Sequence, residues 1–450
     1  MAFSDLRAYL DALGGELIRV AEPLHPRFEV AALLSALQGA GRPVLCDNVV
    51  GHPGRRIAGN LLASRGLAAK ALGCAEEDLV ATYVARSAGR IAPVRAREVP
   101  VQAVVHREPR DVSTLLPLLT HYEKDAAPFL TCGVVLARDP ASGRRGMGIH
   151  RMMWKGGRRF GMLLANPPLS QFLAASEAKD EPLEVAVALG VDPATLLAAV
   201  VKTGPGGPDK LDIAGSLRGA PVELAPALSV ALEVPARAEV ILEGHILPGL
   251  REPEGPFGEN TGYYFQNHSP VMEVSALTHR EDFIFPALVP WTAEVDTLLS
   301  LAGGAELLGQ LQGLVRGVTD LEITPGTCSF AAVIAVRDCP KHEVRRLIHL
   351  ALNLDRRLKS VTVVDDEVDL RNPREVAWAL ATRWQPARDT VLLEGLEGYV
   401  IDPSAGGGAA SKVGYDATRG PGGEFERIAL PVVAVARARE VAESILGVRR

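Results

Sequence analysis

A short loop at residues 254–259 constrains this chain more than any other segment. It reads Glu-Gly-Pro-Phe-Gly-Glu and continues as Asn-Thr-Gly-Tyr-Tyr. Pro256 has a fixed φ angle, and Gly255 and Gly258 can adopt angles that other residues resist, so we expect a rigid turn that holds Glu254 and Glu259 at set positions. Two carboxylates in fixed, unequal environments can separate into an acid and a base. A tight turn with two solvated acids is the simpler alternative.

Length and composition indicate a multidomain globular protein. The chain has 450 residues, 47% of them apolar and 23% charged, and two to three domains are expected at this length. A net charge of −6 without a basic block, and an aromatic content of 5%, argue against a nucleic-acid partner. No charged-then-apolar leader or membrane-length apolar run is present, and the five cysteines have no metal or redox spacing. We therefore expect a cytoplasmic protein without membrane or nucleic-acid partners.

Three domains are expected from the changing pattern of the chain. Residues 1–100 mix short helical and strand patterns and predict a small N-terminal α/β domain. Residues 101–305 consist mainly of short strands between Gly, Pro and Asp residues and predict a β-barrel-like central domain. Residues 306–450 alternate strands and helices and predict a C-terminal α/β domain. The expected class is therefore multidomain α+β.

Three segments and one pair of residues carry more specific expectations. Residues 169–178 with 183–189 are expected to form one helical interruption of the central strands. Residues 402–424, rich in Gly, Ser and Asp, are interpreted as a loop crossing the surface. Residues 440–446 predict a terminal helix that could dock on a neighbouring subunit. The pair His121 and Asp125 is interpreted as a helix cap or a turn.

Four separated stretches resemble the UbiD family of prenylated-flavin-dependent decarboxylases, in the order in which that family has them. They are CGVVLARDP at 132–140 with GIHR at 148–151, LEVPARAEVILEG at 232–244 leading into the loop at 254–259, DDEVDL at 365–370 with WALATR at 378–383, and SKVGYDAT at 411–418. The resemblance implies that the central domain is a split β-barrel of the flavin-reductase type. It also implies a homo-oligomer, most simply a homodimer formed through the C-terminal domain and its tail.

The resemblance implies that Arg151, Glu254 and Glu259 form a Glu–Arg–Glu acid–base network. An arginine fork can bind a carboxylate through two nitrogens and hold a neighbouring glutamate ionised. Ile149, His150 and Arg151 are then expected to contact the flavin. The alternative for Arg151 is an ordinary strand arginine on a solvent face, which its position before a Met-Met-Trp stretch disfavours.

The chain departs from the family at the metal site. By resemblance, an Asn, a His and a Glu normally hold a divalent metal on the flavin phosphate. Here the Asn position is Gly146, no histidine occurs from residue 151 to residue 244, and the Glu position is Lys210. We therefore expect no divalent metal. Either Lys210 reaches the phosphate with its ammonium group, or the cofactor is no longer bound. Lys359 matches a family lysine that contacts the phosphate, although a solvated strand end is an equal alternative.

The leading interpretation is a reversible, non-oxidative decarboxylase of an aromatic or α,β-unsaturated carboxylic acid. By resemblance it uses prenylated FMN, supplied by a flavin prenyltransferase, to store the electrons that remain when carbon dioxide departs. Glu259 is then the proton donor, while Arg151 and Glu254 orient the acid. Two alternatives stay open: a cofactor-free paralogue that acts as a structural or regulatory subunit, and a decarboxylase that uses another cofactor in the same cleft.

Overall fold

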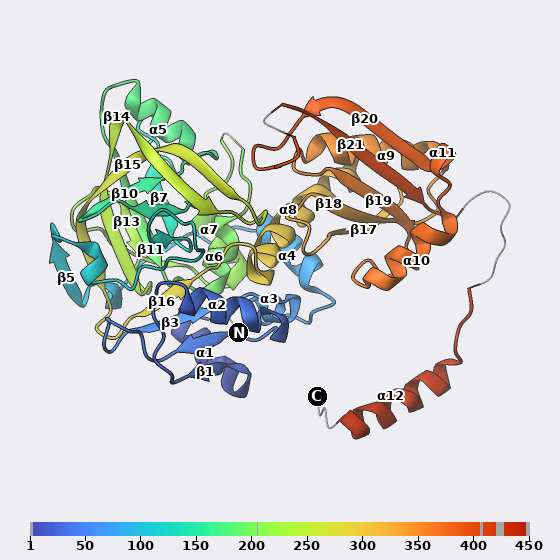
Figure 1. Ribbon diagram of the computed structural model, residues 1–450, viewed down its shortest axis with the longest axis horizontal. Helices are drawn as coiled ribbons and strands as arrows, with labels where there is room; N and C mark the ends of the chain where they lie inside the picture. The colour runs from blue at the N-terminus through green and yellow to red at the C-terminus, as the bar shows by residue number, and fades with distance from the viewer. Residues whose placement is uncertain (1–2, 205, 406–407, 420–426, 447–450) are drawn as a thin grey trace.

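The computed structural model describes residues 3–204, 206–405, 408–419 and 427–446. Figure 1 shows the N-terminal and central parts packed against each other, with the C-terminal sheet beside them and helix α8 between the two bodies. No helix in these ranges is long and apolar enough to cross a membrane. The chain is thus a mixed α+β protein of several packed units.

The N-terminal unit is a four-stranded sheet in the order β1-β2-β3-β16, flanked by helices. Its elements are α1 (Leu6–Leu13), β1 (Ile18–Val20), α2 (Glu29–Leu37), β2 (Val44–Cys46), β3 (Arg56–Gly59), α3 (Arg65–Leu72), α4 (Leu79–Ala88) and the later strand β16 (Ile284–Ala287). Capping explains where α1 begins, because the Asp5 carboxylate accepts a hydrogen bond from the Ala8 amide at 2.9 Å. Since β16 pairs in parallel with β3, the chain returns to this sheet after completing the central unit.

The central unit contains an open sheet whose strands follow the path β6-β9-β10-β15-β14-β11-β7-β8, with β5 added beside β15. The strands of this sheet are β5 (Val104–Arg107), β6 (Phe129–Leu130), β7 (Val134–Arg138), β8 (Arg145–Ile149), β9 (Met152–Trp154), β10 (Arg159–Met162), β11 (Leu183–Leu189), β14 (Val240–Gly258) and β15 (Tyr264–His279). A separate three-stranded sheet has the order β13-β12-β4, formed by β4 (Val94–Arg95), β12 (Glu223–Pro226) and β13 (Glu233–Pro235). Its helices are α5 (Leu169–Glu177), α6 (Pro193–Ala199) and α7 (Lys210–Arg218). Because no pairing joins the two ends of this path among the described residues, the expected split barrel is not confirmed.

The C-terminal unit is a five-stranded sheet in the order β17-β18-β19-β21-β20. Its elements are α8 (Ala293–Leu314), β17 (Val318–Ile323), β18 (Ala331–Val336), α9 (Lys341–Leu354), β19 (Ser360–Asp365), α10 (Pro373–Arg383), α11 (Pro386–Asp389), β20 (Thr390–Glu397), β21 (Ala409–Ala417) and α12 (Val432–Leu446). Helix α12 lies apart from the rest of the molecule in Figure 1. It includes the segment 440–446, for which the sequence predicts a terminal helix.

Two expectations about local structure are wrong. Residues 183–189 form strand β11 rather than a helix, because β14 and β7 pair with it on both sides, and the apolar run at 185–189 is that of a strand buried on both faces. The described part of the segment 402–424 is not only a loop, since β21 pairs in parallel with β19 along residues 413–417. Gly414 is required there, because a Cβ atom would lie 2.1 Å from a methyl carbon of Ile348. Tertiary pairing has overridden the turn-like composition.

Candidate active site

Arg151 lies between strands β8 and β9 and reaches across to the long β14–β15 hairpin. Its Nε and Nη2 atoms donate to the two carboxylate oxygens of Glu254, each at 2.9 Å. The side chain of Glu254 is fully buried and that of Arg151 is 8% exposed. A two-point charge-assisted contact of this kind fixes both side chains in distance and plane.

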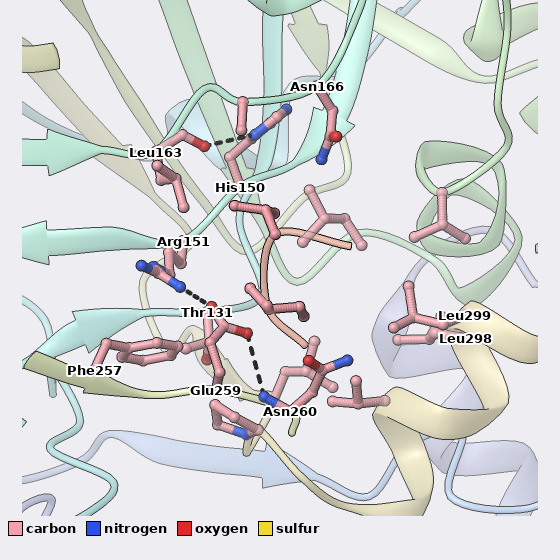
Figure 2. Close-up of a pocket in the computed structure, with 18 of the residues that line it drawn as sticks. Thr131, His150, Arg151, Leu163, Asn166, Phe257, Glu259, Asn260, Leu298 and Leu299 are labelled. Atoms are coloured by element: carbon pink, nitrogen blue, oxygen red, sulfur yellow. Dashed lines mark hydrogen bonds and ion pairs between the residues drawn. The ribbon is translucent and has the colours of Figure 1, made fainter. Parts of the chain in front are cut away.

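Glu259 completes the network at the tip of the same hairpin. Its Oε1 atom pairs with Nη1 of Arg151, and its Oε2 atom accepts a hydrogen bond from the Asn260 amide at 3.2 Å, as Figure 2 shows. The Phe257 ring lies against the guanidinium group, with Cζ of Arg151 at 4.6 Å from the ring centroid. One arginine therefore bridges a fully buried carboxylate and one that borders a cavity.

The segment between the two glutamates is not the expected turn, because it belongs to strand β14 as far as Gly258, but its backbone is tightly packed. Gly255 has a φ angle of +105°, and a Cβ atom there would lie 2.6 Å from the carbonyl oxygen of Phe265. A Cβ atom at Gly258 would lie 2.2 Å from the ring of Tyr122. Neither position can carry a side chain without displacing its neighbours.

A cavity of about 360 Å³ lies beside this network, between the central unit, α8 and the C-terminal unit. Figure 2 shows Arg151 and Glu259 on one side of it and Leu298 and Leu299 of α8 on the other. Its lining residues are Thr131, Ile149, His150, Arg151, Leu163, Ala165, Asn166, Val200, Phe257, Glu259, Asn260, Leu288, Pro290, Val295, Leu298, Leu299, Arg356, Tyr399, Val400 and Ile401. Most of these residues are apolar, and the acid–base residues Arg151 and Glu259 lie on one side of the cavity.

His150 and Ile149 both line the cavity, so three of the expected flavin contacts, including Arg151, are brought together. The Nδ1 atom of His150 lies 3.0 Å from the Leu163 carbonyl oxygen, and this contact requires a proton on Nδ1. Burial lowers the pKa of His150 to about 4, so the ring is neutral near pH 7. A neutral imidazole can contact a ligand here but cannot compensate an anionic charge.

The corner where the family resemblance expects a metal is filled by apolar side chains. A Cβ atom at Gly146 would lie 2.4 Å from the Phe172 ring and 3.1 Å from Cγ of Pro168, so an asparagine could not be accommodated without repacking. Within the part of the chain that the structure describes, no group of three or more His, Cys, Asp or Glu side chains is arranged to hold a metal ion. The residues at this corner do not fit the metal set of the family.

The two expected phosphate contacts lie outside the cavity lining. Lys210, the first residue of α7, is 7% exposed, and its Nζ atom donates to the Ala199 carbonyl oxygen at 2.9 Å. Burial lowers the pKa of Lys210 to about 8. Lys359 pairs with Asp402 at 3.0 Å on the C-terminal unit. Their proposed contact with a phosphate remains a prediction.

Sequence reasoning missed the far walls of the cavity. Leu298 and Leu299 belong to a helix without a polar motif, and Arg356 and Tyr399 lie more than two hundred residues after Arg151. Asn166 belongs to a segment that the sequence distinguishes only by its lack of histidine. No local pattern marks such residues, because the packing of the C-terminal unit, with α8, beside the central unit brings them to the site.

Comparisons with known proteins match this chain over most of its length. Three family models match consecutive parts of the chain: the 3-octaprenyl-4-hydroxybenzoate carboxy-lyase N-terminal domain over residues 12–87, its Rift-related domain over residues 92–293 and its C-terminal domain over residues 296–417. The anhydromevalonate phosphate decarboxylase of Methanothermobacter thermautotrophicus is 32% identical over 420 residues, covering 92% of this chain and 96% of that protein.

Solved structures of similar proteins include flavin complexes. The UbiD-class enzyme HmfF from Pelotomaculum thermopropionicum in complex with FMN has a TM-score of 0.92 and 36% identity, covering 97% of this chain and 99% of that one. An evolved dimeric form of the same enzyme in complex with prFMN has a TM-score of 0.88 and 36% identity, covering 96% and 98%. The similarity extends over all three units and over the segments that form the cavity. This chain belongs to the UbiD family and is an enzyme of the carboxy-lyase class.

Proposed function

We propose that this protein decarboxylates an aromatic or α,β-unsaturated carboxylic acid with prenylated FMN, and that Glu259 delivers the proton to the carbon that loses carbon dioxide. The single observation that carries the proposal is the Arg151 bridge between Glu254 and Glu259 at one end of a mainly apolar cavity. A carboxylic acid side chain that borders a cavity can transfer a proton to a bound ligand.

The cavity fits the ring system of a flavin in its chemistry. Its volume of about 360 Å³ lies within the range of small-molecule sites, and most of the residues that line it are apolar. Ile149, His150 and Arg151 would hold the ring, and Lys210 and Lys359 are proposed for the phosphate. When bound, prenylated FMN supplies the electron sink that amino-acid side chains lack. The related structures that contain FMN and prFMN support this assignment.

The protein side chains divide the remaining work. Arg151 holds Glu259 at one end of the cavity, and Glu254 keeps the guanidinium group in a fixed plane. Leu298 and Leu299 exclude water from the opposite wall. Glu259, 17% exposed, stays accessible enough to exchange its proton between turnovers.

The test is expression with and without a flavin prenyltransferase, followed by the absorbance spectrum and mass of the bound cofactor. Carbon dioxide release is then measured with aromatic and unsaturated acids, including anhydromevalonate phosphate because a relative is named for it. The proposal expects turnover only from protein that contains the prenylated flavin. Turnover without any flavin would favour another cofactor, and the absence of both flavin and turnover would favour the non-catalytic paralogue.

We propose that the protein assembles as a homodimer or a higher homo-oligomer through its C-terminal tail. Helix α12 lies apart from the rest of the molecule (Figure 1), and Val433 and Ile445 are 82% and 77% exposed. Apolar side chains on an unpacked helix gain free energy by packing on a second copy. Light scattering of the full chain and of a variant that ends at residue 427 tests this; a monomeric full chain at micromolar concentration would contradict it.

A further inference from the structure

We propose that Asp125 is a positioning residue that fixes Glu259 through the Gly258 amide, and that Tyr122 supports it from the same turn. The proposal rests on the proton-donor role of Glu259 described above. Asp125 lies 134 residues before Glu259 in the chain, in the turn that precedes β6. It does not line the cavity, so it acts through the loop rather than on a ligand.

The Asp125 carboxylate joins two segments of backbone. Its Oδ1 atom accepts a hydrogen bond from the Gly258 amide at 2.9 Å. Its Oδ2 atom accepts from the amides of His121 at 3.0 Å and Tyr122 at 2.9 Å. The side chain is fully buried. The residue immediately before Glu259 is therefore tied to a turn that packs against the core.

The hydrogen-bond pattern explains why this position is an aspartate. The three groups that hydrogen-bond to the side chain are all backbone N–H donors, and only a carboxylate accepts on both oxygens. Burial raises the pKa of Asp125, while the three amides and nearby Arg151 oppose that rise. An asparagine of the same shape would turn an NH₂ group towards at least one of these amides and lose that contact.

A second set of contacts joins the turn that contains Asp125 to the segment between the two glutamates. The Tyr122 ring occupies the space above Gly258, where a Cβ atom would lie 2.2 Å from it, and the Tyr122 hydroxyl donates to the Pro290 carbonyl oxygen. The Ala126 amide donates to the Pro256 carbonyl oxygen at 2.8 Å. The turn that contains Tyr122 and Ala126 therefore contacts the segment between the glutamates at two residues, Pro256 and Gly258.

The two glutamates depend on this turn to different degrees. Glu254 lies within β14, pairs with Asn267 across the hairpin and is held by two nitrogens of Arg151. Glu259 lies beyond the last residue of β14, where the chain turns towards Tyr263. Loss of the Asp125 contact therefore displaces Glu259 and leaves the Arg151–Glu254 pair in place.

The test compares Asp125→Asn with the matched control Asp111→Asn. Asp111 also accepts a local hydrogen bond, from the Ser113 amide at 2.9 Å, but contacts neither glutamate. We expect Asp125→Asn to lower kcat by roughly tenfold to a hundredfold, the range for a misplaced reacting group, with KM and flavin content within about twofold of wild type. Deuterium exchange of residues 254–262 should accelerate in Asp125→Asn and not in Asp111→Asn.

Each outcome decides the proposal. A kcat within twofold of wild type, or a rise in KM alone, would overturn it. If Asp125→Asn fails to fold, Tyr122→Leu removes the ring above Gly258 and keeps the carboxylate; the proposal then requires the same fall in kcat and the same faster exchange. If the wild type decarboxylates no acid, the proposed function fails, whereas the exchange comparison still decides whether Asp125 holds the loop.

Discussion

Two buried cations near the cavity differ in how their charges are balanced. Arg151 is 8% exposed on its side chain and bridges two carboxylates, one of them fully buried. Lys210 is 7% exposed as a residue, and its Nζ atom donates to a carbonyl oxygen, that of Ala199. Burial of a cation costs free energy unless an anion or several acceptors compensate it. The charge of Arg151 is therefore balanced by carboxylates of the protein. The charge of Lys210 has no such balance among the contacts of the described residues.

The difference separates catalysis from ligand binding. A cation that already holds two glutamates is suited to fix the geometry of proton transfer. A cation without an anionic partner among the described residues is suited to receive an anion from outside the chain, as the proposed contact with a flavin phosphate requires. Burial is the main reason for the low pKa of His150 on the cavity wall, and the charge of Lys210 lowers that pKa further. The ammonium group therefore acts electrostatically at the cavity, although its side chain lies behind the lining.

Removal of the Arg151 side chain, whose charge two glutamates balance, should have the largest effect on the protein. In Arg151→Ala, Glu254 remains buried without its partner, and breaking a buried ion pair costs about 3–5 kcal/mol of unfolding free energy. Decarboxylation should be lost as well. Denaturant unfolding of the variant measures the stability, with Arg159→Ala as the control because its pair with Glu252 is partly exposed and should contribute under about 1 kcal/mol. Equal losses of unfolding free energy in the two variants would show that the buried pair of Arg151 contributes no more than a partly exposed ion pair.

Glu259→Gln should leave the fold and flavin binding intact while turnover falls at least on the order of a hundredfold. The amide has nearly the same shape but cannot donate an acidic proton. Stopped-flow or steady-state release of carbon dioxide measures the effect. Glu252→Gln in the preceding strand β14, where Glu252 pairs with Lys155 and Arg159, is the matched control and should stay near wild type. Near-normal turnover in Glu259→Gln would remove this residue from the mechanism.

The sequence predicts the site around Arg151, whose charge is balanced by two glutamates, better than the site around Lys210. Local composition is enough to infer that the loop at 254–259 is rigid, since Gly255 and Pro256 act on their own backbone. The contact of Arg151 with both glutamates follows from family resemblance, and the hydrogen bonds of the structure show it directly. Together with the family resemblance, the identity of Gly146 predicts a missing ligand, but only the structure shows that Phe172 fills the space beside it.

Long-range pairing accounts for most of what the sequence does not predict. Residues 183–189 lack the alternation of a half-exposed strand, because β11 is covered on both faces, and the apolar run at 185–189 does not distinguish a buried strand from a buried helix. The Gly- and Ser-rich composition around residue 411 hides strand β21, whose pairing partners come from distant segments. The cavity walls that contain Arg356 and Tyr399 depend on how two units pack, which periodicity does not encode.

The charge of Lys210 should give the apo protein a distinct pH dependence. Its pKa is about 8 in the folded protein, compared with 10.5 for an unperturbed lysine. Between these values the unfolded chain binds more protons than the folded one, so wild type gains stability as pH rises from 8 to 10.5, by up to roughly 3 kcal/mol at 1.36 kcal/mol per pKa unit. Lys210→Met lacks this gain. Denaturant unfolding of both proteins at about pH 7 and about pH 10 measures the difference; a constant difference would mean that Lys210 titrates normally.

Substitutions at Lys210 should also weaken flavin binding. An ammonium about 4 Å from a phosphate contributes about 4 kcal/mol of gross Coulomb energy per unit charge at intermediate dielectric, and desolvation removes much of it. We expect Lys210→Ala to raise the Kd for FMN by roughly tenfold, and Lys210→Glu to raise it further by adding a negative charge. Quenching of flavin fluorescence measures Kd without turnover. An unchanged Kd in both variants would mean that the phosphate is bound elsewhere.

Metal removal should have the smallest effect, because neither charged site needs a divalent ion. Arg151 is balanced by Glu254 and Glu259, and the position where the family has an asparagine ligand is closed by Phe172. Prolonged dialysis against EDTA should therefore leave flavin content and turnover within about twofold of the untreated protein, and elemental analysis should find no stoichiometric manganese. One tightly held divalent ion per chain would contradict this. It would require ligands that the apolar packing around Gly146 does not supply, and so a rearrangement of this corner when the flavin binds.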